Sequence, residues 1–147
     1  MTLKSHAKIN LSLKVKKKSN KNKLHNIQSL FCQITLHDII RIKKNREKKD
    51  TIKFYGKFAK NINKKDNSIS ETLKILRKKK IISNYYSVSI NKKIPVFSGM
   101  GGGTSNSATL IRYFLNSNID KKLFNIFKKK IGSDLKLFFY NQGFLKN

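Results

Sequence analysis

Acidic residues, cysteine and proline are scarce in this 147-residue chain, and tryptophan is absent. Cys32 is the only cysteine, which excludes an internal disulfide and a zinc site built from several cysteines, and we expect a buried thiol. No segment approaches the roughly 18 apolar residues of a membrane-spanning helix, and the first residues lack the apolar run of a secretory signal. We therefore expect a cytoplasmic protein without a membrane partner.

The charge balance is the strongest bias in the composition. Lysine and arginine together number 34 against seven acidic residues, so the formal net charge is +27. Such a charge favours binding to polyanions and opposes compaction through self-repulsion. Arginine, whose planar fork reads bases better than lysine does, occupies only four positions: Arg41, Arg46, Arg77 and Arg112. A basic nucleic-acid-binding module with little sequence preference is therefore one hypothesis for the function.

The first clear structural pattern is an alternation of apolar and polar residues over residues 7–15. It predicts a half-buried strand whose inner face carries Ile9, Leu11, Leu13 and Val15. A lysine in such a strand, Lys8, is expected on the polar face. The length of the chain predicts one domain, and a hydrophobic fraction of 38% permits a core.

Further elements follow from the periodicity of apolar residues. Ser68 and Glu71 stand in the register of a capping box, which predicts the start of a helix. Strands are predicted over residues 34–42, 51–55 and 86–90, and helices over residues 68–79, 105–116 and 121–131. Strands come first and are followed by a mixture of helices and strands, so we expect the α+β class.

Glycine is rare but clustered, since four of the seven glycines fall within residues 99–103. The glycine loop, defined here as residues 96–104, runs directly into a predicted helix. Glycine leaves no Cβ in the way of a ligand, and a helix N-terminus presents free N–H groups. The pattern predicts a phosphate-binding loop, with a flexible surface turn as the alternative. The lysine of a Walker loop and the last glycine of a dinucleotide fingerprint are missing, so the loop is of another type.

Other polar positions could carry chemistry. Asp134 stands between Gly-Ser and an apolar run, which suits a catalytic base or metal ligand, or else a turn or N-cap aspartate. His25 and the pair Asp66 and Asn67, which precedes a predicted helix, are weak signals when each is taken alone.

Taken together in chain order, these positions resemble the motifs of the GHMP kinase superfamily of small-molecule kinases. Five motifs occur in the family's order within residues 5–143: Ala-Lys-Ile-Asn-Leu (7–11), Leu-His-Asn-Ile-Gln-Ser (24–29), Asp-Asn (66–67), the glycine-rich stretch 94–108 and Gly-Ser-Asp-Leu-Lys-Leu-Phe (132–138). The chain departs from the family at Leu24, which replaces a tyrosine, and at Lys136, which replaces a proline. Phe97 and Ser98 replace two glycines of the family's loop.

The resemblance implies a fold, a reaction and a set of substrate-side residues. The fold would be the ribosomal-protein-S5-domain-2-like α+β arrangement, and the reaction would move a phosphoryl group from ATP, with Mg²⁺, to an alcohol that carries a cytidine diphosphate group. Asp134 would act as base or orienter of the acceptor hydroxyl, and Lys8 would be a catalytic cation beside it. Asn10 would help to hold the substrate, and His25 would hydrogen-bond the cytosine. No residue is expected to form a dedicated metal site.

The resemblance also implies the ATP-binding residues. Asn67 and Lys92 would lie by the adenosine. The phosphates would be wrapped by loop residues: Gly99, Gly101, Gly102, Gly103, Thr104 and Ser105.

Superfamily members have a second domain, so residues 1–147 would form the N-terminal, ATP-binding domain and the C-terminal domain would be absent. A second chain could then complete the cleft. The nucleic-acid-binding module and a non-catalytic kinase relic stay open as alternatives. The kinase hypothesis requires Lys8, Ser105 and Asp134 to converge on one cleft. The nucleic-acid hypothesis requires lysines grouped on one face with aromatic side chains among them.

Overall fold

The computed structural model describes residues 1–15, 27–60, 62–63, 66–116 and 119–146. One mixed sheet contains β1 (Thr2–Val15), β2 (Ile27–Lys44), β3 (Thr51–Tyr55), β4 (Tyr86–Asn91) and β5 (Gln142–Lys146). The strand order is β1-β2-β4-β3, and β5 pairs with the other end of β2. Paired strands are antiparallel except β3 and β4, which are parallel. Strand β2 therefore carries β1 along one edge and both β4 and β5 along the other.

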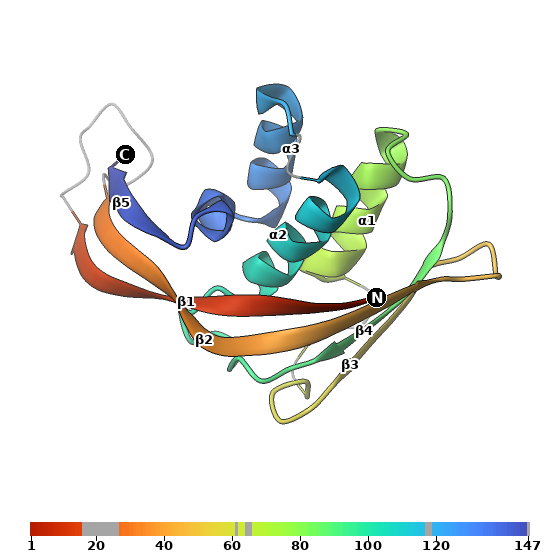
Figure 1. Cartoon of the computed structure of the whole chain (residues 1–147), viewed down its shortest axis with the longest axis horizontal. Coiled ribbons are helices and arrows are strands. Elements are labelled where there is room, and N and C mark those ends of the chain that lie inside the picture. Colours follow the sequence, from red (N-terminus) through yellow and green to blue (C-terminus); the bar gives the residue numbers. More distant parts are fainter. Residues whose placement is uncertain (16–26, 61, 64–65, 117–118, 147) are drawn as a thin grey trace.

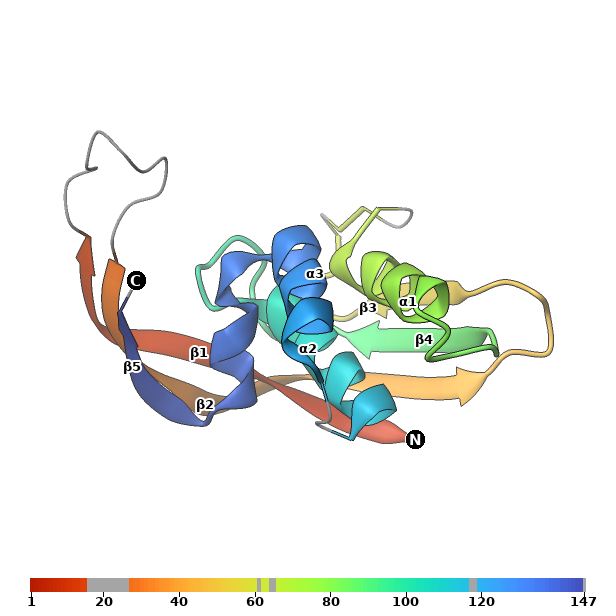
Figure 2. The ribbon, with the colours of Figure 1, turned by 90° about the horizontal axis from the view of Figure 1, so that it is seen from above.

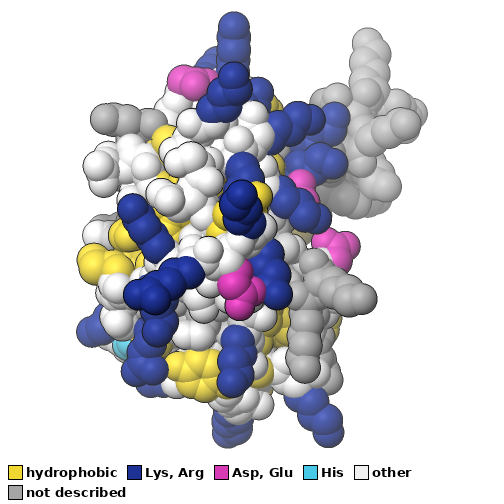
Figure 3. Space-filling model, turned by 90° about the vertical axis from the view of Figure 1, so that its right-hand side faces the viewer, with side chains coloured by type: hydrophobic (Ala, Val, Ile, Leu, Met, Phe, Trp, Pro, Cys, Tyr) yellow, Lys and Arg dark blue, Asp and Glu magenta, His cyan; other side chains and the backbone are white. Residues whose placement is uncertain are grey.

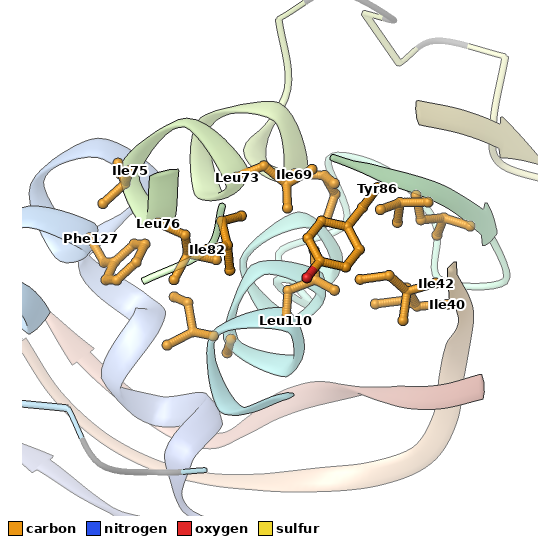
Figure 4. Close-up of a cluster of buried hydrophobic side chains, with 14 of the residues drawn as sticks. Ile40, Ile42, Ile69, Leu73, Ile75, Leu76, Ile82, Tyr86, Leu110 and Phe127 are labelled. Carbon is orange, nitrogen blue, oxygen red and sulfur yellow. The ribbon is translucent and has the colours of Figure 1, made fainter. Parts of the chain in front are cut away.

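Three α-helices and one 3₁₀ helix lie on one face of this sheet (Figure 1 and Figure 2): α1 (Ser68–Lys78), α2 (Gly102–Leu115), α3 (Lys121–Ile131) and η1 (Ser133–Phe139). Helix α1 is the crossover that the parallel pairing of β3 and β4 requires. Between helices and sheet lies one apolar cluster, in which Leu73 of α1, Leu110 of α2 and Phe127 of α3 join Ile40 and Ile42 of β2 (Figure 4). The predicted α+β class is confirmed.

Elements with a clear local pattern agree with the sequence-based prediction. The strand predicted over residues 51–55 and the helix predicted over residues 121–131 have the bounds of β3 and α3. The apolar run over residues 34–42 is only part of the longer β2. Helix α2 begins at Gly102 rather than near Ser105, since tertiary packing overrides the low helix propensity of glycine.

The expected inner face of β1 is wrong in two respects. Leu11, Leu13 and Val15 are 60%, 54% and 55% exposed, whereas Lys8 is only 5% exposed. For Lys8 the cause is irregular pairing with β2, whose register shifts between residues 6 and 8, so that the adjacent residues Ala7 and Lys8 are both buried. Residues 10–15 are exposed on both faces of the strand, so this end of β1 has no buried face for Leu11, Leu13 and Val15. Cys32, expected to be buried, is half-buried.

The N-cap of α1 is one residue earlier than predicted. The capping box consists of Asn67 and Ser70 rather than Ser68 and Glu71. Asn67 Oδ1 accepts hydrogen bonds from the backbone N–H groups of Ile69 and Ser70, at 3.1 and 3.0 Å. Ser70 Oγ in turn lies 3.1 Å from the backbone nitrogen of Asn67, which donates to it. Helix α1 thus starts at a fixed point beside the glycine loop, where Ser68 Oγ donates to the Gly103 carbonyl at 2.9 Å.

Replacing the cap tests this arrangement. Asn67→Ala is expected to lower the free energy of unfolding by about 1 kcal/mol, because two N–H groups lose their acceptor. Asn67→Asp is the matched control, since aspartate keeps the acceptor and suits the helix dipole. Urea unfolding followed by circular dichroism measures both, and equal losses in the two variants would contradict the capping role.

Candidate active site

Two charged side chains from opposite ends of the chain meet beside the glycine loop. Lys8 Nζ lies 3.7 Å from Asp134 Oδ2 and donates a hydrogen bond to Asn10 Oδ1 at 3.2 Å. The Lys8 side chain is 6% exposed and that of Asp134 is 46% exposed. A small ligand can therefore reach the carboxylate, while the ammonium is held behind it by the protein.

Strand β1 is tied directly to the glycine loop and to α2. The backbone N–H of Lys8 donates to the Met100 carbonyl at 3.1 Å. Ser105 Oγ, in the first turn of α2, donates to the His6 carbonyl at 2.6 Å and lies 2.8 Å from Ser5 Oγ. These bonds set the position of Lys8 against the loop. The structure thus places Lys8 beside Asp134, whereas the Ser105 hydroxyl is bonded to β1 and contacts neither of these two charged groups through a hydrogen bond.

Asp134 lies in the first turn of η1, directly after α3. The N-cap of η1 is Gly132, and no side chain forms a cap hydrogen bond there. Asp134 is therefore not an N-cap aspartate, which was one of the alternatives in the sequence analysis. On η1, the Ser133 Oγ donates to Asp134 Oδ1 at a long 3.4 Å. The carboxylate is therefore placed by the helix and is available to a ligand.

A pocket of about 550 Å³ opens between the glycine loop, the start of α1 and the start of η1. Most of the predicted ATP-binding residues line it, and Asp134 is also part of the lining. The predicted residues in its lining are Asn67, Lys92, Gly99, Gly101, Gly102, Gly103 and Thr104. Ser105, predicted with them, is not part of the lining.

The N-terminus of α2 faces this pocket. Gly101 is the N-cap in the left-handed region, with φ +69°, and a Cβ there would lie 2.4 Å from Phe138 Cζ. Only glycine fits at this position. The first N–H groups of α2 have no partner within the helix, and the positive end of its dipole points the same way. Such an end is an anion-binding site, and a phosphate group is the ligand that it suits.

The sequence analysis missed Asn106, which also lines the pocket. Asn106 is 1% exposed, and its Oδ1 has no hydrogen-bond partner among the described residues. A buried carbonyl oxygen without a partner is costly unless a ligand or water satisfies it. The signal was present in the sequence as an amide following Thr104 and Ser105.

The second missed residue is Asp38 of β2, which is fully buried and forms an ion pair with the Lys92 ammonium. Asp38 Oδ1 also accepts hydrogen bonds from the backbone N–H groups of Lys93 and Ile94, at 2.7 and 2.9 Å. Lys92 Nζ lies 3.1 Å from where a Cβ on Gly102 would stand. The pair therefore fixes the segment that leads from β4 into the glycine loop.

A smaller hollow lies between β2, β5 and the end of η1. It has a volume of about 200 Å³ and is lined partly by Phe31, Tyr140 and Phe144. Phe31 is the register partner of Asn10 in the sheet, although Lys8 and Asn10 are not themselves part of the lining. His25, predicted to bind the cytosine, lies outside the described residues, as does Leu24.

The surface and the described helices add three facts. Lysine and arginine side chains are spread over the face drawn in Figure 3, with hydrophobic and acidic atoms between them. Within the described ranges, no group of three or more His, Cys, Asp or Glu side chains could hold a metal ion. Among the helices of those ranges, none has the length and apolar character needed to cross a membrane.

Comparison with known proteins defines the class. The family of GHMP kinases N terminal domains matches residues 67–135, which include α1, the glycine loop and Asp134. A solved 4-(cytidine 5'-diphospho)-2C-methyl-D-erythritol kinase superposes with a TM-score of 0.75 at 18% identity, covering 100% of this chain and 52% of that one. A mevalonate kinase gives 0.67 at 15% identity, covering 100% and 54%. Residues 67–135 therefore belong to the family of GHMP kinase N-terminal domains, and the chain has the fold of that domain.

Within the superfamily, the chain is similar to 4-diphosphocytidyl-2-C-methyl-D-erythritol kinases. It is 46% identical to the Pelagibacter ubique protein of that name over 137 residues, which cover 90% of this chain and 48% of the relative. It is 31% identical to the Ureaplasma parvum protein over 140 residues, covering 94% and 52%. The chain thus spans about half the length of the curated relatives that it matches.

Proposed function

We propose that the chain binds ATP and transfers its γ-phosphoryl group to the 2-hydroxyl of 4-diphosphocytidyl-2-C-methyl-D-erythritol, a step of isoprenoid precursor synthesis in the cytoplasm. The observation that carries the proposal is the 3.7 Å approach of Lys8 to Asp134 in the lining of a glycine-rich pocket. The names of the relatives at 46% and 31% identity support the choice of acceptor.

On the acceptor side, the half-exposed carboxylate of Asp134 accepts a hydrogen bond from the 2-hydroxyl and takes its proton as the oxygen attacks phosphorus. The buried ammonium of Lys8 stabilises the negative charge that develops on the acceptor oxygen and on the transferring group. Asn10 holds this ammonium in place through its Oδ1. Phosphoryl transfer depends mostly on positioning and on neutralisation of charge, so few reactive side chains are needed.

On the donor side, the N-terminus of α2 holds the triphosphate through backbone N–H groups. The Thr104 hydroxyl and the Asp134 carboxylate line the same pocket and are oxygen donors of the kind that Mg²⁺ prefers. These two side chains, with the phosphates of ATP, would hold the ion. When bound, Mg²⁺ neutralises phosphate charge.

The cytidine end of the acceptor is proposed to lie in the smaller hollow between β2, β5 and η1, where Phe31, Tyr140 and Phe144 offer aromatic surface. This surface stands in for the tyrosine that the superfamily motif has at Leu24. His25 is proposed to hydrogen-bond the cytosine. Because the chain spans about half of its relatives, we propose that it supplies the ATP-binding half of the cleft and that a further segment or second chain supplies the rest.

The test is ATP turnover by the purified chain with and without the cytidine diphosphate acceptor, combined with a variant of the loop. Gly102→Val is expected to weaken ATP binding more than about tenfold, because a branched side chain displaces at least one N–H bond to phosphate. Its Cβ would already lie 3.1 Å from Lys92 Nζ and from Ile94. Isothermal titration calorimetry measures the affinity.

The matched control is Thr109→Val in the same helix. Thr109 is buried, does not line the pocket, and its hydroxyl has no partner among the described residues, so an isosteric valine should leave ATP affinity unchanged. Acceptor-dependent ADP release by the parent chain would support the proposal. ATP binding without turnover would favour the relic, and salt-dependent nucleic-acid binding without ATP binding would favour the basic module.

A further inference from the structure

Phe97 combines two unfavourable features at the rim of the large pocket. Its backbone lies in the left-handed region, with φ +60°, which is uncommon for a residue with a bulky side chain. Its side chain is 95% exposed, the highest value among the exposed large hydrophobic residues of the described chain. Phe97 nevertheless belongs to the residues that line the pocket formed by the glycine loop.

The strained conformation of Phe97 is held by its neighbours. Ser98 Oγ donates to the Pro95 carbonyl at 2.9 Å, and the Met100 N–H donates to Ser98 Oγ at 3.4 Å. The Ser98 side chain thus bonds to the backbone on both sides of Phe97 and closes the turn. Glycine would adopt the same φ without strain, and the superfamily motif has glycine at this position. A bulky residue that persists in a strained and exposed place points to a function rather than to stability.

The position of the ring suggests its ligand. The proposed function places a triphosphate at the N-terminus of α2, which starts at Gly102, a few residues after Phe97. A nucleotide bound there extends its ribose and base away from the helix within the same pocket. The planar base is the apolar, aromatic part of that ligand, and an exposed phenyl ring stacks on any base because every base has a π-face.

We propose that the aromatic ring of Phe97 stacks on the base of the bound nucleotide; this inference rests on the proposed function. Phe97 occupies a position that is glycine in the superfamily motif, and a glycine there could contact a ligand only through its backbone. It adds base-dependent affinity to a site whose remaining contacts are made with phosphate. A stacked base would also remove the Phe97 ring from water, which accounts for a phenylalanine that the protein itself leaves exposed.

The experiment compares ATP with inorganic tripolyphosphate, which has the phosphates but no base. Affinities of the full chain, Phe97→Gly and Phe97→Tyr are measured by isothermal titration calorimetry with Mg²⁺. Phe97→Gly is expected to bind ATP about tenfold more weakly and tripolyphosphate equally well, because only the stacking contact is lost. Phe97→Tyr keeps an aromatic ring and should bind both ligands like the parent chain. The unfolding temperature of Phe97→Gly should not be lower, since glycine removes the backbone strain.

The outcomes separate this inference from the proposed function. A parent chain that binds neither ligand overturns both. A parent chain that binds both ligands, together with a Phe97→Gly variant whose ATP affinity is unchanged, overturns only the stacking role. Equal weakening of ATP and tripolyphosphate by Phe97→Gly also overturns it, because the ring would then act on the loop instead of the base.

Discussion

An Asp134→Asn variant is expected to lose phosphoryl transfer by about 10²–10⁴-fold, the range for removal of a positioned general base, while ATP binding stays close to that of the parent chain. Asparagine keeps the shape of the side chain but cannot take a proton from the acceptor hydroxyl. The triphosphate is held by backbone N–H groups of α2, which the substitution leaves in place, and the asparagine carbonyl still offers an oxygen donor for Mg²⁺. The expected signature is a fall in kcat with little change in ATP affinity, measured by steady-state turnover and by calorimetry.

Asp120→Asn is the matched control for Asp134→Asn. It removes the same charge from another exposed aspartate, the N-cap of α3, whose side chain accepts from the Leu123 N–H at 2.8 Å. Asparagine is an equally good N-cap, so activity and stability should both stay unchanged. Unchanged turnover in Asp134→Asn would remove this carboxylate from the mechanism. A loss of activity accompanied by a lower unfolding temperature would indicate a structural role next to Lys8 instead.

The fold was predictable where the pattern is local. Strand β3 and helix α3 match their predicted bounds because each presents a single face to the core, and periodicity records exactly that kind of exposure pattern. Periodicity failed to predict which residues of strand β1 are buried. Its register shifts depend on pairing with β2, a partner that the alternation of residues 7–15 does not encode, so the buried Lys8 was expected on the polar face.

The candidate site was likewise predictable from the sequence only in part. Motif order indicated that Lys8, Asp134 and the glycine loop belong together, although 126 positions separate the two charged residues, and the structure places these charges 3.7 Å apart. The partner of Lys92 was not predictable. Asp38 stands in an apolar run 54 positions before Lys92, and only the pairing of β2 with β4 brings the two elements together. A buried charge reveals its partner through tertiary structure rather than through local sequence.

The Asp38→Ala variant is expected to show the largest loss of stability, about 3–5 kcal/mol in the free energy of unfolding. The substitution leaves the Lys92 ammonium, which is 2% exposed, without its counter-charge. It also removes the acceptor for two backbone N–H groups, those of Lys93 and Ile94. Because these residues lead into the glycine loop, ATP affinity should fall together with stability. Urea unfolding and calorimetry measure the two effects.

Two further variants separate charge from hydrogen bonding at this position. Asp38→Asn keeps an acceptor for the Lys93 and Ile94 N–H groups and should therefore be less destabilising than Asp38→Ala. Glu47→Ala breaks an exposed ion pair with Lys49, whose side chains are 62% and 70% exposed, and should leave the free energy of unfolding unchanged within error. If Asp38→Ala were as stable as Glu47→Ala, the pair would not anchor the loop. Loss of ATP affinity without loss of stability would instead indicate that Asp38 contributes to ATP binding by positioning Lys92, which lines the pocket.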